Sequence, residues 1–365
     1  MNITVMGAGN SGLATAAHLS MEGHSVTLWN RSEETIKELL ETKTIHCEGV
    51  IEGSCTIHAV TADIEVAVSD PDLILITTPA TAHRELAELI GRYIKRSTLI
   101  VLNPGRTFGA LEFKEVYEQF NQEYPQTIAE TQTIIYTCRK TAPDAVNVVA
   151  LKTEVLLSTF NPAENRSIIA RMPRCLRAHL KPARSMVETS IGNVGMILHC
   201  APLLLNAGWT ENVHSTYKYY YDGITPSVGR LLEKIDGERL QVAEGLGWEL
   251  EATKDWLNRS YGLKGSTLFD AIQQNKAYRT IEAPSRLEHR YILEDVPFGL
   301  VPLEGVGHAL GLPMRETGLI IDLASSIMER DFRAEGRKVY DFHILFRRKG
   351  AQGNDGTSWF AQASS

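Results

Sequence analysis

The sequence predicts an α/β N-terminal domain with a doubly wound parallel sheet, followed by a mostly α-helical C-terminal domain. Three observations support this fold class. Strand-like and helical patterns alternate over the first half, a glycine-rich turn follows the first strand, and strand signals nearly vanish after Pro182. The 365 residues suffice for about two domains. We expect these domains at residues 1–183 and 184–348, followed by a poorly ordered tail at 349–365.

The elements of the first half follow one another in a regular order. We expect strands at residues 3–6, 25–29, 73–76 and 98–102, and helices up to about residue 21, from about residue 33, and over 82–92. This alternation is typical of parallel strands joined by crossover helices. Later strand-like runs at 133–137, 145–151 and 155–159 are expected to add antiparallel edge strands to the same sheet.

Helical periodicity dominates the second half of the chain. We expect helices at roughly residues 186–206, 228–246, 252–260, 267–274, 286–310 and 314–333. Glycines and prolines separate these segments, so the pattern indicates a compact helical domain rather than one long helix.

A glycine-rich turn, Gly7-Ala8-Gly9-Asn10-Ser11-Gly12, joins the first predicted strand to the first predicted helix. Its glycines permit a tight turn, a close approach to a pyrophosphate, and close packing of the helix on the strand. The helix N-terminus then faces the phosphates. In this context the motif predicts a Rossmann-type NAD(P)-binding domain rather than a turn without a ligand. We assign these residues to the cofactor site: Gly7, Gly9, Asn10, Ser11, Gly12, and from later turns Thr78, Pro79 and Asn103.

The end of the second strand selects the form of the cofactor. An NAD-specific site normally places Asp or Glu there, to bind the ribose hydroxyls. This chain has Asn30, Arg31 and Ser32 instead, and the sequence shows no carboxylate nearby that would repel a 2′-phosphate. We therefore expect NADP, with NAD as the alternative. In the other interpretation Arg31 is a solvated surface residue and Ser32 only begins the next helix.

Composition and charge restrict the partners. With 37 Lys+Arg against 44 Asp+Glu, the net charge of −7 provides no general attraction for nucleic acid or anionic lipid. We found neither a long apolar span nor a signal peptide, which favours a cytoplasmic protein that acts on small molecules. The five scattered cysteines favour reduced thiols over a disulfide framework. The sequence leaves open whether the chain forms a homodimer.

One group of possible metal ligands occurs in the first half: His46, Cys47, Cys55 and His58. Its spacing matches no familiar zinc pattern, and the segment alternates like a short hairpin. We therefore expect a hairpin and no metal.

Two segments of the second half carry candidate catalytic groups. His199 lies in an apolar stretch, where it is either a buried core residue or an acid–base group. Arg290 precedes Asp295 by five residues. These two are either solvated charges, with Asp295 capping the next helix, or part of a site. The residues alone do not decide between these interpretations.

Together these motifs resemble the opine dehydrogenase family, in the order in which the family has them and up to about Gly336. The matching segments are Gly7-Ala8-Gly9-Asn10, Leu102-Asn103-Pro104-Gly105, Glu130-Thr131, Thr137-Cys138-Arg139, residues 193–199 and 223–229, His289-Arg290-Tyr291 and Glu294-Asp295. The chain is most similar to the bacterial branch that makes N-(1-carboxyethyl)-norvaline-type opines, and less similar to octopine and nopaline synthases.

The resemblance implies an enzyme that joins an α-amino acid to an α-keto acid such as pyruvate and reduces the resulting imine with NADH or NADPH. The catalytic histidine of the family corresponds to His199, its supporting aspartate to Asp295, and its carboxylate-binding arginine to Arg290. In the family a proline directly follows the histidine, whereas here Cys200 and Ala201 intervene. We therefore expect a different pocket wall beside the imidazole.

Two alternatives remain from the sequence. The chain could be an NADP-dependent reductase of a ketone or hydroxy acid with the same two-domain plan, or a cofactor sensor without catalysis. Reductases of the first kind commonly use a lysine as the acid, and the sensor would not need the set of His199, Arg290 and Asp295.

Overall fold

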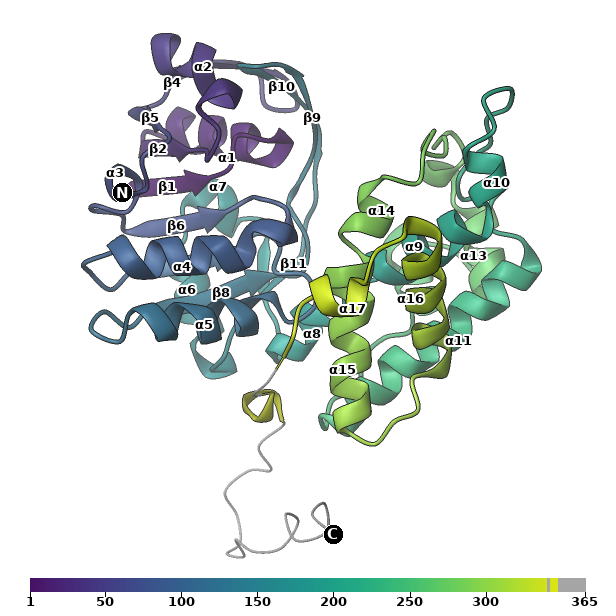
Figure 1. Ribbon diagram of the computed structural model, residues 1–365. Coiled ribbons are helices and arrows are strands. Elements are labelled where there is room, and N and C mark those ends of the chain that lie inside the picture. Colours follow the sequence, from purple (N-terminus) through teal and green to yellow (C-terminus); the bar gives the residue numbers. More distant parts are fainter. Residues whose placement is uncertain (340–341, 347–365) are drawn as a thin grey trace, which may run out of the picture.

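The computed structural model describes residues 1–339 and 342–346 and has two lobes (Figure 1). The N-terminal lobe contains an eight-stranded sheet in the order β12-β11-β8-β7-β6-β1-β2-β5. Neighbouring strands are parallel except for β11, which runs antiparallel to β8. The strands are β1 (Asn2–Met6), β2 (Ser25–Trp29), β5 (Ala59–Thr61), β6 (Leu73–Ile76), β7 (Leu99–Leu102), β8 (Thr127–Thr131), β11 (Val155–Thr159) and β12 (Leu180–Pro182).

Helices cover both faces of this sheet, which confirms the doubly wound fold class. They are α1 (Asn10–Met21), α2 (Glu33–Thr42), α3 (Ile64–Ala67), α4 (His83–Tyr93), α5 (Gly109–Phe120), α6 (Asn165–Arg171) and α7 (Arg174–Arg177), with short 3-10 turns η1 (Ala80–Ala82) and η2 (Pro162–Glu164). Alternate residues of β6 enter two different cores. Ile74 and Ile76 pack with α4 and α5, whereas Leu73 and Leu75 pack with α1. This alternation follows from the two-residue period of a strand, and it explains the continuous apolar run in the sequence.

A second sheet, in the order β4-β3-β10-β9, corrects part of the sequence prediction. Its strands are β3 (Thr44–Gly49), β4 (Gly53–Thr56), β9 (Tyr136–Ala142) and β10 (Ala145–Leu151). β3 and β4 form the expected hairpin, but β10 pairs in parallel with β3 rather than with the main sheet. The strand expected at 133–137 is wrong, because β8 ends at Thr131 and β9 begins at Tyr136. Of the three expected edge strands, only β11 lies in the main sheet.

The second lobe is helical, and the expected helices at 228–246, 252–260 and 267–274 are confirmed. Its elements are α8 (Met186–Ser190), α9 (Gly195–Leu205), α10 (Ala207–Thr210), α11 (Pro226–Gly245), α12 (Thr253–Tyr261), α13 (Leu268–Gln274), η3 (Lys276–Tyr278), α14 (Arg290–Leu293), η4 (Val296–Leu300), α15 (Val301–Ala309), α16 (Arg315–Met328), α17 (Phe332–Glu335) and η5 (His343–Leu345).

Three of the expected helices are broken. The segment 286–310 is not one helix, because the chain leaves the α-helical path after α14 and passes through a π-helical turn, η4, that begins next to Pro297. The segment 186–206 divides into α8 and α9, and the side chain of Asn193 accepts a hydrogen bond from the Gly195 N–H at the start of α9. The segment 314–333 ends as α16 at Met328 and resumes as α17. Because of these interruptions, side chains in the three segments point in directions that one continuous helix would not give them.

The two lobes are in extensive contact. One hydrophobic core runs from β6, α4 and α5 into the helical lobe. After α17 the chain returns to the N-terminal lobe (Figure 1), where the buried guanidinium of Arg337 donates to Glu112 Oε2 at 2.8 Å and to the carbonyl of Thr107 at 2.6 Å. The tail expected at 349–365 lies outside the described residues.

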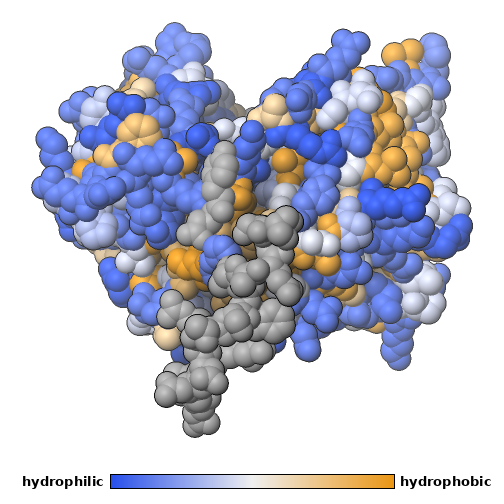
Figure 2. Space-filling view, turned by 60° about the horizontal axis from the view of Figure 1, so that its bottom comes forward, coloured by the Kyte–Doolittle hydropathy of each residue, from blue (hydrophilic) through white to orange (hydrophobic). Residues whose placement is uncertain are grey.

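No helix among the described residues combines the length and hydrophobicity needed to cross a bilayer. On the face drawn in Figure 2, hydrophilic residues predominate, and the hydrophobic ones gather in separate patches, one of them on the helical lobe at the right.

Candidate active site

The glycine loop has the geometry that a pyrophosphate needs. Gly7 adopts φ +111°, which side-chain-bearing residues rarely adopt, and a Cβ on Gly12 would lie 1.7 Å from the Gly7 carbonyl oxygen. Gly9 is the N-cap of α1, and a Cβ there would meet nothing within 4 Å. The loop is therefore tight on the side of the sheet and open at the helix N-terminus, where an anion binds favourably.

Neighbouring strands bring the other predicted cofactor residues to the same edge of the sheet. β6 runs parallel to β1, so Thr78 follows β6 beside Gly7. The Thr78 hydroxyl is buried and has no hydrogen-bond partner among the described residues, which suits a ligand contact. Ser11 donates weakly to the Thr77 carbonyl at 3.4 Å, and the buried Asn103 accepts from Thr131 at 2.9 Å. Pro79 is exposed beside them.

The predicted cofactor-selecting residues lie next to the glycine loop, with one correction. Asn30 Oδ1 accepts from the Ala8 N–H at 3.1 Å, and Asn30 Nδ2 donates to the Ser32 carbonyl at 3.0 Å. Ser32 is the N-cap of α2, without a side-chain capping bond. The expectation of no nearby carboxylate is wrong, because the 71% exposed Arg31 forms an ion pair with Glu85 on α4. Glu85 is 54 residues away in the sequence, so only the fold reveals this contact.

The second sheet adds a cation to the glycine loop. The backbone N–H of Lys140, on β9, donates to Asn10 Oδ1 at 2.7 Å, and the Lys140 ammonium lies 3.4 Å from the Ala8 carbonyl. Burial lowers the pKa of Lys140, although Glu38 and Asp144 oppose this shift. Sequence reasoning missed Lys140, because no local pattern indicates that β9 passes over the start of α1.

His199 and Asp295 form a hydrogen-bonded pair at the lobe interface. His199 Nδ1 lies 2.8 Å from Asp295 Oδ2, and the two side chains are 18% and 2% exposed. The ring of Tyr291 stacks on the imidazole with centroids 3.9 Å apart and an angle of 11° between the planes. Burial acts to raise the pKa of Asp295, but Arg106 and then His199 lower it by more, so the carboxylate stays ionised. The α-helix is interrupted between α14 and η4, and this interruption places Asp295 against α9.

Arg290 lies beside this pair, and its backbone carbonyl accepts a hydrogen bond from the Asp295 N–H at 3.3 Å, whereas its guanidinium pairs with Glu294. Its side chain is 55% exposed, and Nη2 lies 3.1 Å from Glu294 Oε2. A second arginine, Arg106, reaches the same acids from the N-terminal lobe. Sequence reasoning missed Arg106, which follows the Asn103-Pro104-Gly105 turn and is 189 residues from Asp295.

These groups open onto a cleft of about 490 Å³ that both lobes line. His199, Arg290 and Tyr291 line it from the helical lobe, and Asn10 and Ser11 line it from the glycine loop. Its cationic residues are Arg106, Arg139, Lys152 and Arg290, and its tyrosine and tryptophan residues are Tyr136, Tyr220, Trp256, Tyr278 and Tyr291. None of the described residues that line the cleft is Asp or Glu. The cleft therefore joins the glycine loop, the hydrogen-bonded His199–Asp295 pair and a set of cations.

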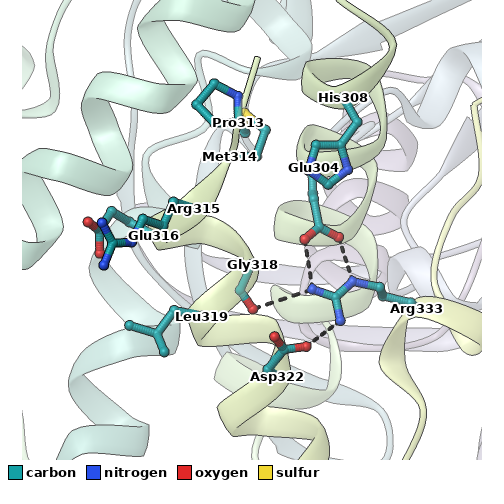
Figure 3. Close-up of a pocket in the computed structure, with 10 residues that line it drawn as sticks. All are labelled: Glu304, His308, Pro313, Met314, Arg315, Glu316, Gly318, Leu319, Asp322 and Arg333. Carbon is teal, nitrogen blue, oxygen red and sulfur yellow. Dashed lines mark hydrogen bonds and ion pairs between the residues drawn. The ribbon is translucent and has the colours of Figure 1, made fainter. Parts of the chain in front are cut away.

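A second hollow, between α15 and α16, has no such features (Figure 3). Arg333 points into it, but Glu304 binds two of its nitrogens at 2.7 Å each, and Asp322 pairs with the third. Because these charges satisfy one another, the hollow shows no group that requires a ligand.

Comparison with known proteins identifies the family. The model of the NAD/NADP octopine/nopaline dehydrogenase α-helical domain matches residues 182–328, and that of the NAD-dependent glycerol-3-phosphate dehydrogenase N-terminus matches residues 2–130. An opine dehydrogenase of Arthrobacter sp. (strain 1C) is 38% identical over 336 residues, which cover 92% of this chain and 93% of the relative. The chain belongs to the opine dehydrogenase family. A vitopine synthase of Allorhizobium ampelinum is 21% identical over 94% of this chain and 95% of the relative.

Solved structures of other opine dehydrogenases share the fold of this one. An octopine dehydrogenase in complex with NADH and agmatine superimposes with a TM-score of 0.73, at 18% identity, over 90% of both chains. An NADP+-bound yersinopine dehydrogenase gives 0.73 at 16% identity, over 94% of this chain and 95% of the other.

Family membership settles the reaction class. This opine dehydrogenase is an NAD(P)-dependent oxidoreductase that acts on a CH–NH group, through reductive condensation of an amino acid with a keto acid. The prediction from the sequence is confirmed in family, fold class and activity, and the ketone reductase and sensor alternatives are set aside.

Proposed function

We propose that this opine dehydrogenase uses His199 and Asp295 as its acid–base pair, condenses a neutral α-amino acid with a pyruvate-like α-keto acid, and prefers NADPH. The observation that carries the proposal is the 2.8 Å contact between His199 Nδ1 and the buried Asp295, on a cleft that also reaches the glycine loop. Asp295 holds the proton on Nδ1, so Nε2 is the nitrogen that exchanges a proton with the substrates.

Condensation needs a group that both accepts and donates a proton. The amine nitrogen attacks the keto carbon, and His199 takes one proton from the nitrogen and returns it to the keto oxygen, which gives a carbinolamine. His199 then takes the second proton from the nitrogen and delivers it to the hydroxyl, which leaves as water while the C=N bond of the imine forms. The ionised Asp295 stabilises the imidazolium in each of these two steps. Hydride for reduction of the imine carbon comes from the nicotinamide cofactor when it is bound.

The cations of the cleft suit two substrate carboxylates. Glu294 and Asp295 already occupy Arg106, whereas Arg290 shares only one contact with Glu294. We propose that Arg290 holds one substrate carboxylate through two parallel hydrogen bonds and that Arg139 or Lys152 holds the other.

The lining also favours one class of amino acid. A positively charged side chain such as that of arginine would meet four cations and no carboxylate in the cleft. An apolar side chain would instead contact aromatic rings. We propose that neutral, apolar amino acids are preferred over basic ones.

The preference for NADPH rests on position 30 and its neighbour. Asn30 lacks the charge that would repel a 2′-phosphate, and a phosphate can compete for Arg31 because an exposed ion pair such as the one with Glu85 contributes little.

Three further proposals come from the sequence. The domain division at residues 183 and 184 is supported by the end of β12 at Pro182 and the start of α8 at Met186. A cytoplasmic location is supported by five cysteines without a disulfide among them. The third proposal is that the chain forms a homodimer, and sedimentation of the purified chain tests it.

The experiment that tests the proposed function follows NADPH oxidation with pyruvate alone, with amino acids alone, and with both. Oxidation only with both, with norvaline or phenylalanine better than arginine, supports it. His199→Ala should lower turnover at least about 100-fold with cofactor affinity nearly unchanged. His214→Ala, on an exposed loop, is the matched control. A His199 variant that keeps its turnover and only melts earlier would make this histidine a structural residue.

A further inference from the structure

Arg106 reaches from the N-terminal lobe to the two acids beside His199. It follows β7, its side chain is only 12% exposed, and its guanidinium nitrogens contact two carboxylates of the helical lobe. Nη2 lies 3.2 Å from Glu294 Oε2, and Nη1 lies 3.4 Å from Asp295 Oδ1. No motif read from the sequence assigned this arginine a role.

Asp295 contacts one partner in each lobe. Its Oδ2 contacts His199, and its Oδ1 contacts Arg106. A buried carboxylate with one partner can rotate or take up a proton, because burial disfavours its charge. With both oxygens occupied, the carboxylate keeps its charge and keeps Oδ2 directed at the imidazole.

Glu294, the residue before Asp295, provides a second contact between the two lobes. Its Oε1 accepts from the Ala80 N–H, in η1 of the N-terminal lobe, at 3.2 Å. Its Oε2 contacts both Arg106 and Arg290. The short segment that carries Asp295 is therefore bound to the N-terminal lobe at two points.

The backbone of Arg106 is itself unusual. It adopts φ +62°, the left-handed region that favours glycine. Residues held in this conformation cluster at functional sites, where the surrounding structure maintains them. Arg, Lys and Met are all unbranched at Cβ, so substitutions among them keep the backbone cost similar and change only the end of the side chain.

We propose that Arg106 is a positioning residue that fixes Asp295, and through it His199, only while the cofactor-binding lobe contacts the helical lobe. The inference rests on the proposed roles of His199 and Asp295. Arg106 also lines the cleft, and its buried Nε–H has no partner among the described residues. Direct binding of a substrate is therefore the competing role.

The pH–rate profile separates the two roles. The charged or titratable groups that face the pair are Arg106, Glu294, Arg290, His289, Cys200 and Tyr291. Arg106→Met removes only one of these, a cation, so the pair should take up its proton more readily. We expect the limb of the profile that reports the proton of the His199–Asp295 pair to move to a pH about 1 unit higher. Arg106→Lys keeps the charge and should move it by less than half as much.

The steady-state constants give a second readout. A positioning residue should lower kcat at least about 30-fold in Arg106→Met and leave both substrate KM values within about threefold of the wild type. A raised KM for one substrate with an unmoved pH limb would overturn the proposal and assign Arg106 to direct substrate binding.

A double-mutant cycle with Asp295→Asn completes the test. If Arg106 acts through Asp295, adding Arg106→Met to Asp295→Asn should cost less than about threefold. Losses that multiply would overturn the proposal. Arg92→Met removes a 51% exposed arginine of α4 and is the matched control for loss of a cation from this lobe. Thermal melting of each variant with bound NADPH shows whether it is folded.

Failure of this inference differs from failure of the proposed function. If Asp295→Asn and His199→Ala keep full turnover, the proposed acid–base pair is wrong. If both lose turnover but Arg106→Met shows neither the pH shift nor the loss of kcat, only the role of Arg106 is wrong.

Discussion

Replacing Asp295 with asparagine tests how much the buried carboxylate contributes to catalysis. The substitution keeps the size of the side chain but removes the charge that Oδ2 presents to His199 at 2.8 Å. A hydrogen bond to a charged group contributes about 1.5–3 kcal/mol, and about 1.4 kcal/mol corresponds to a factor of ten. Loss of this bond alone should therefore lower kcat by about 10- to 150-fold. The loss should be larger if the amide favours the other tautomer of the ring.

The pH dependence gives the sign of the effect. The pKa of Asp295 lies below its ordinary value, because Arg106 and then His199 outweigh burial, so Asp295 is ionised at neutral pH. The negative charge helps the pair to retain a proton. In Asp295→Asn the proton should be lost at lower pH, and the limb of the profile should move down by about 1 pH unit.

The assay is NADPH oxidation with both substrates saturating, measured from pH 5 to pH 9. Asp270→Asn, at an exposed capping position in α13, controls for a general effect of replacing a carboxylate. An unmoved pH limb together with a kcat within about twofold of the wild type would refute the acid–base assignment. A lower melting temperature without a kinetic change would mean that Asp295 only stabilises the lobe interface.

Three other perturbations test separate parts of the molecule. Arg290→Lys should raise the KM of one substrate at least about tenfold and lower turnover, because a point charge cannot make two parallel hydrogen bonds; unchanged KM values for both substrates would reduce Arg290 to a surface charge. Asn30→Asp with Arg31→Ala should invert the cofactor preference, and a wild type that already favours NADH tenfold would contradict the NADPH assignment. His83 is fully buried, and burial and then Arg337 hold its pKa well below the ordinary value, so the unfolded chain binds a proton there that the folded chain does not. Stability from this site is therefore lost as pH falls below about 6.5, by about 1.4 kcal/mol at pH 5.5, and His83→Gln should remove that part of the decrease in unfolding free energy between pH 7.5 and 5.5; an equal decrease in both proteins would show that His83 does not contribute.

Local patterns in the sequence were sufficient to predict the glycine-rich turn between β1 and α1. The turn from Gly7 to Gly12 needs only its own residues and the strand before it, because the close approach of Gly12 to the Gly7 carbonyl is a short-range contact. Four of the parallel strands, β1, β2, β6 and β7, were equally clear, since burial on both faces produces apolar runs such as residues 73–76, whereas β5, β8 and β12 were missed. His199, Arg290 and Asp295 were chosen by resemblance to a family, and their residues alone left a structural interpretation open.

The tertiary structure decided the contacts between distant segments. Asp295 meets His199 across 96 residues and Arg106 across 189, and Arg31 meets Glu85 across 54. β10 joined β3 in a second sheet because strand pairing depends on which edge the fold leaves available, which no local pattern encodes. A side chain's type and local spacing therefore determined which chemistry the sequence could supply. Only the tertiary packing, within each lobe and between the two, determined which charges face one another.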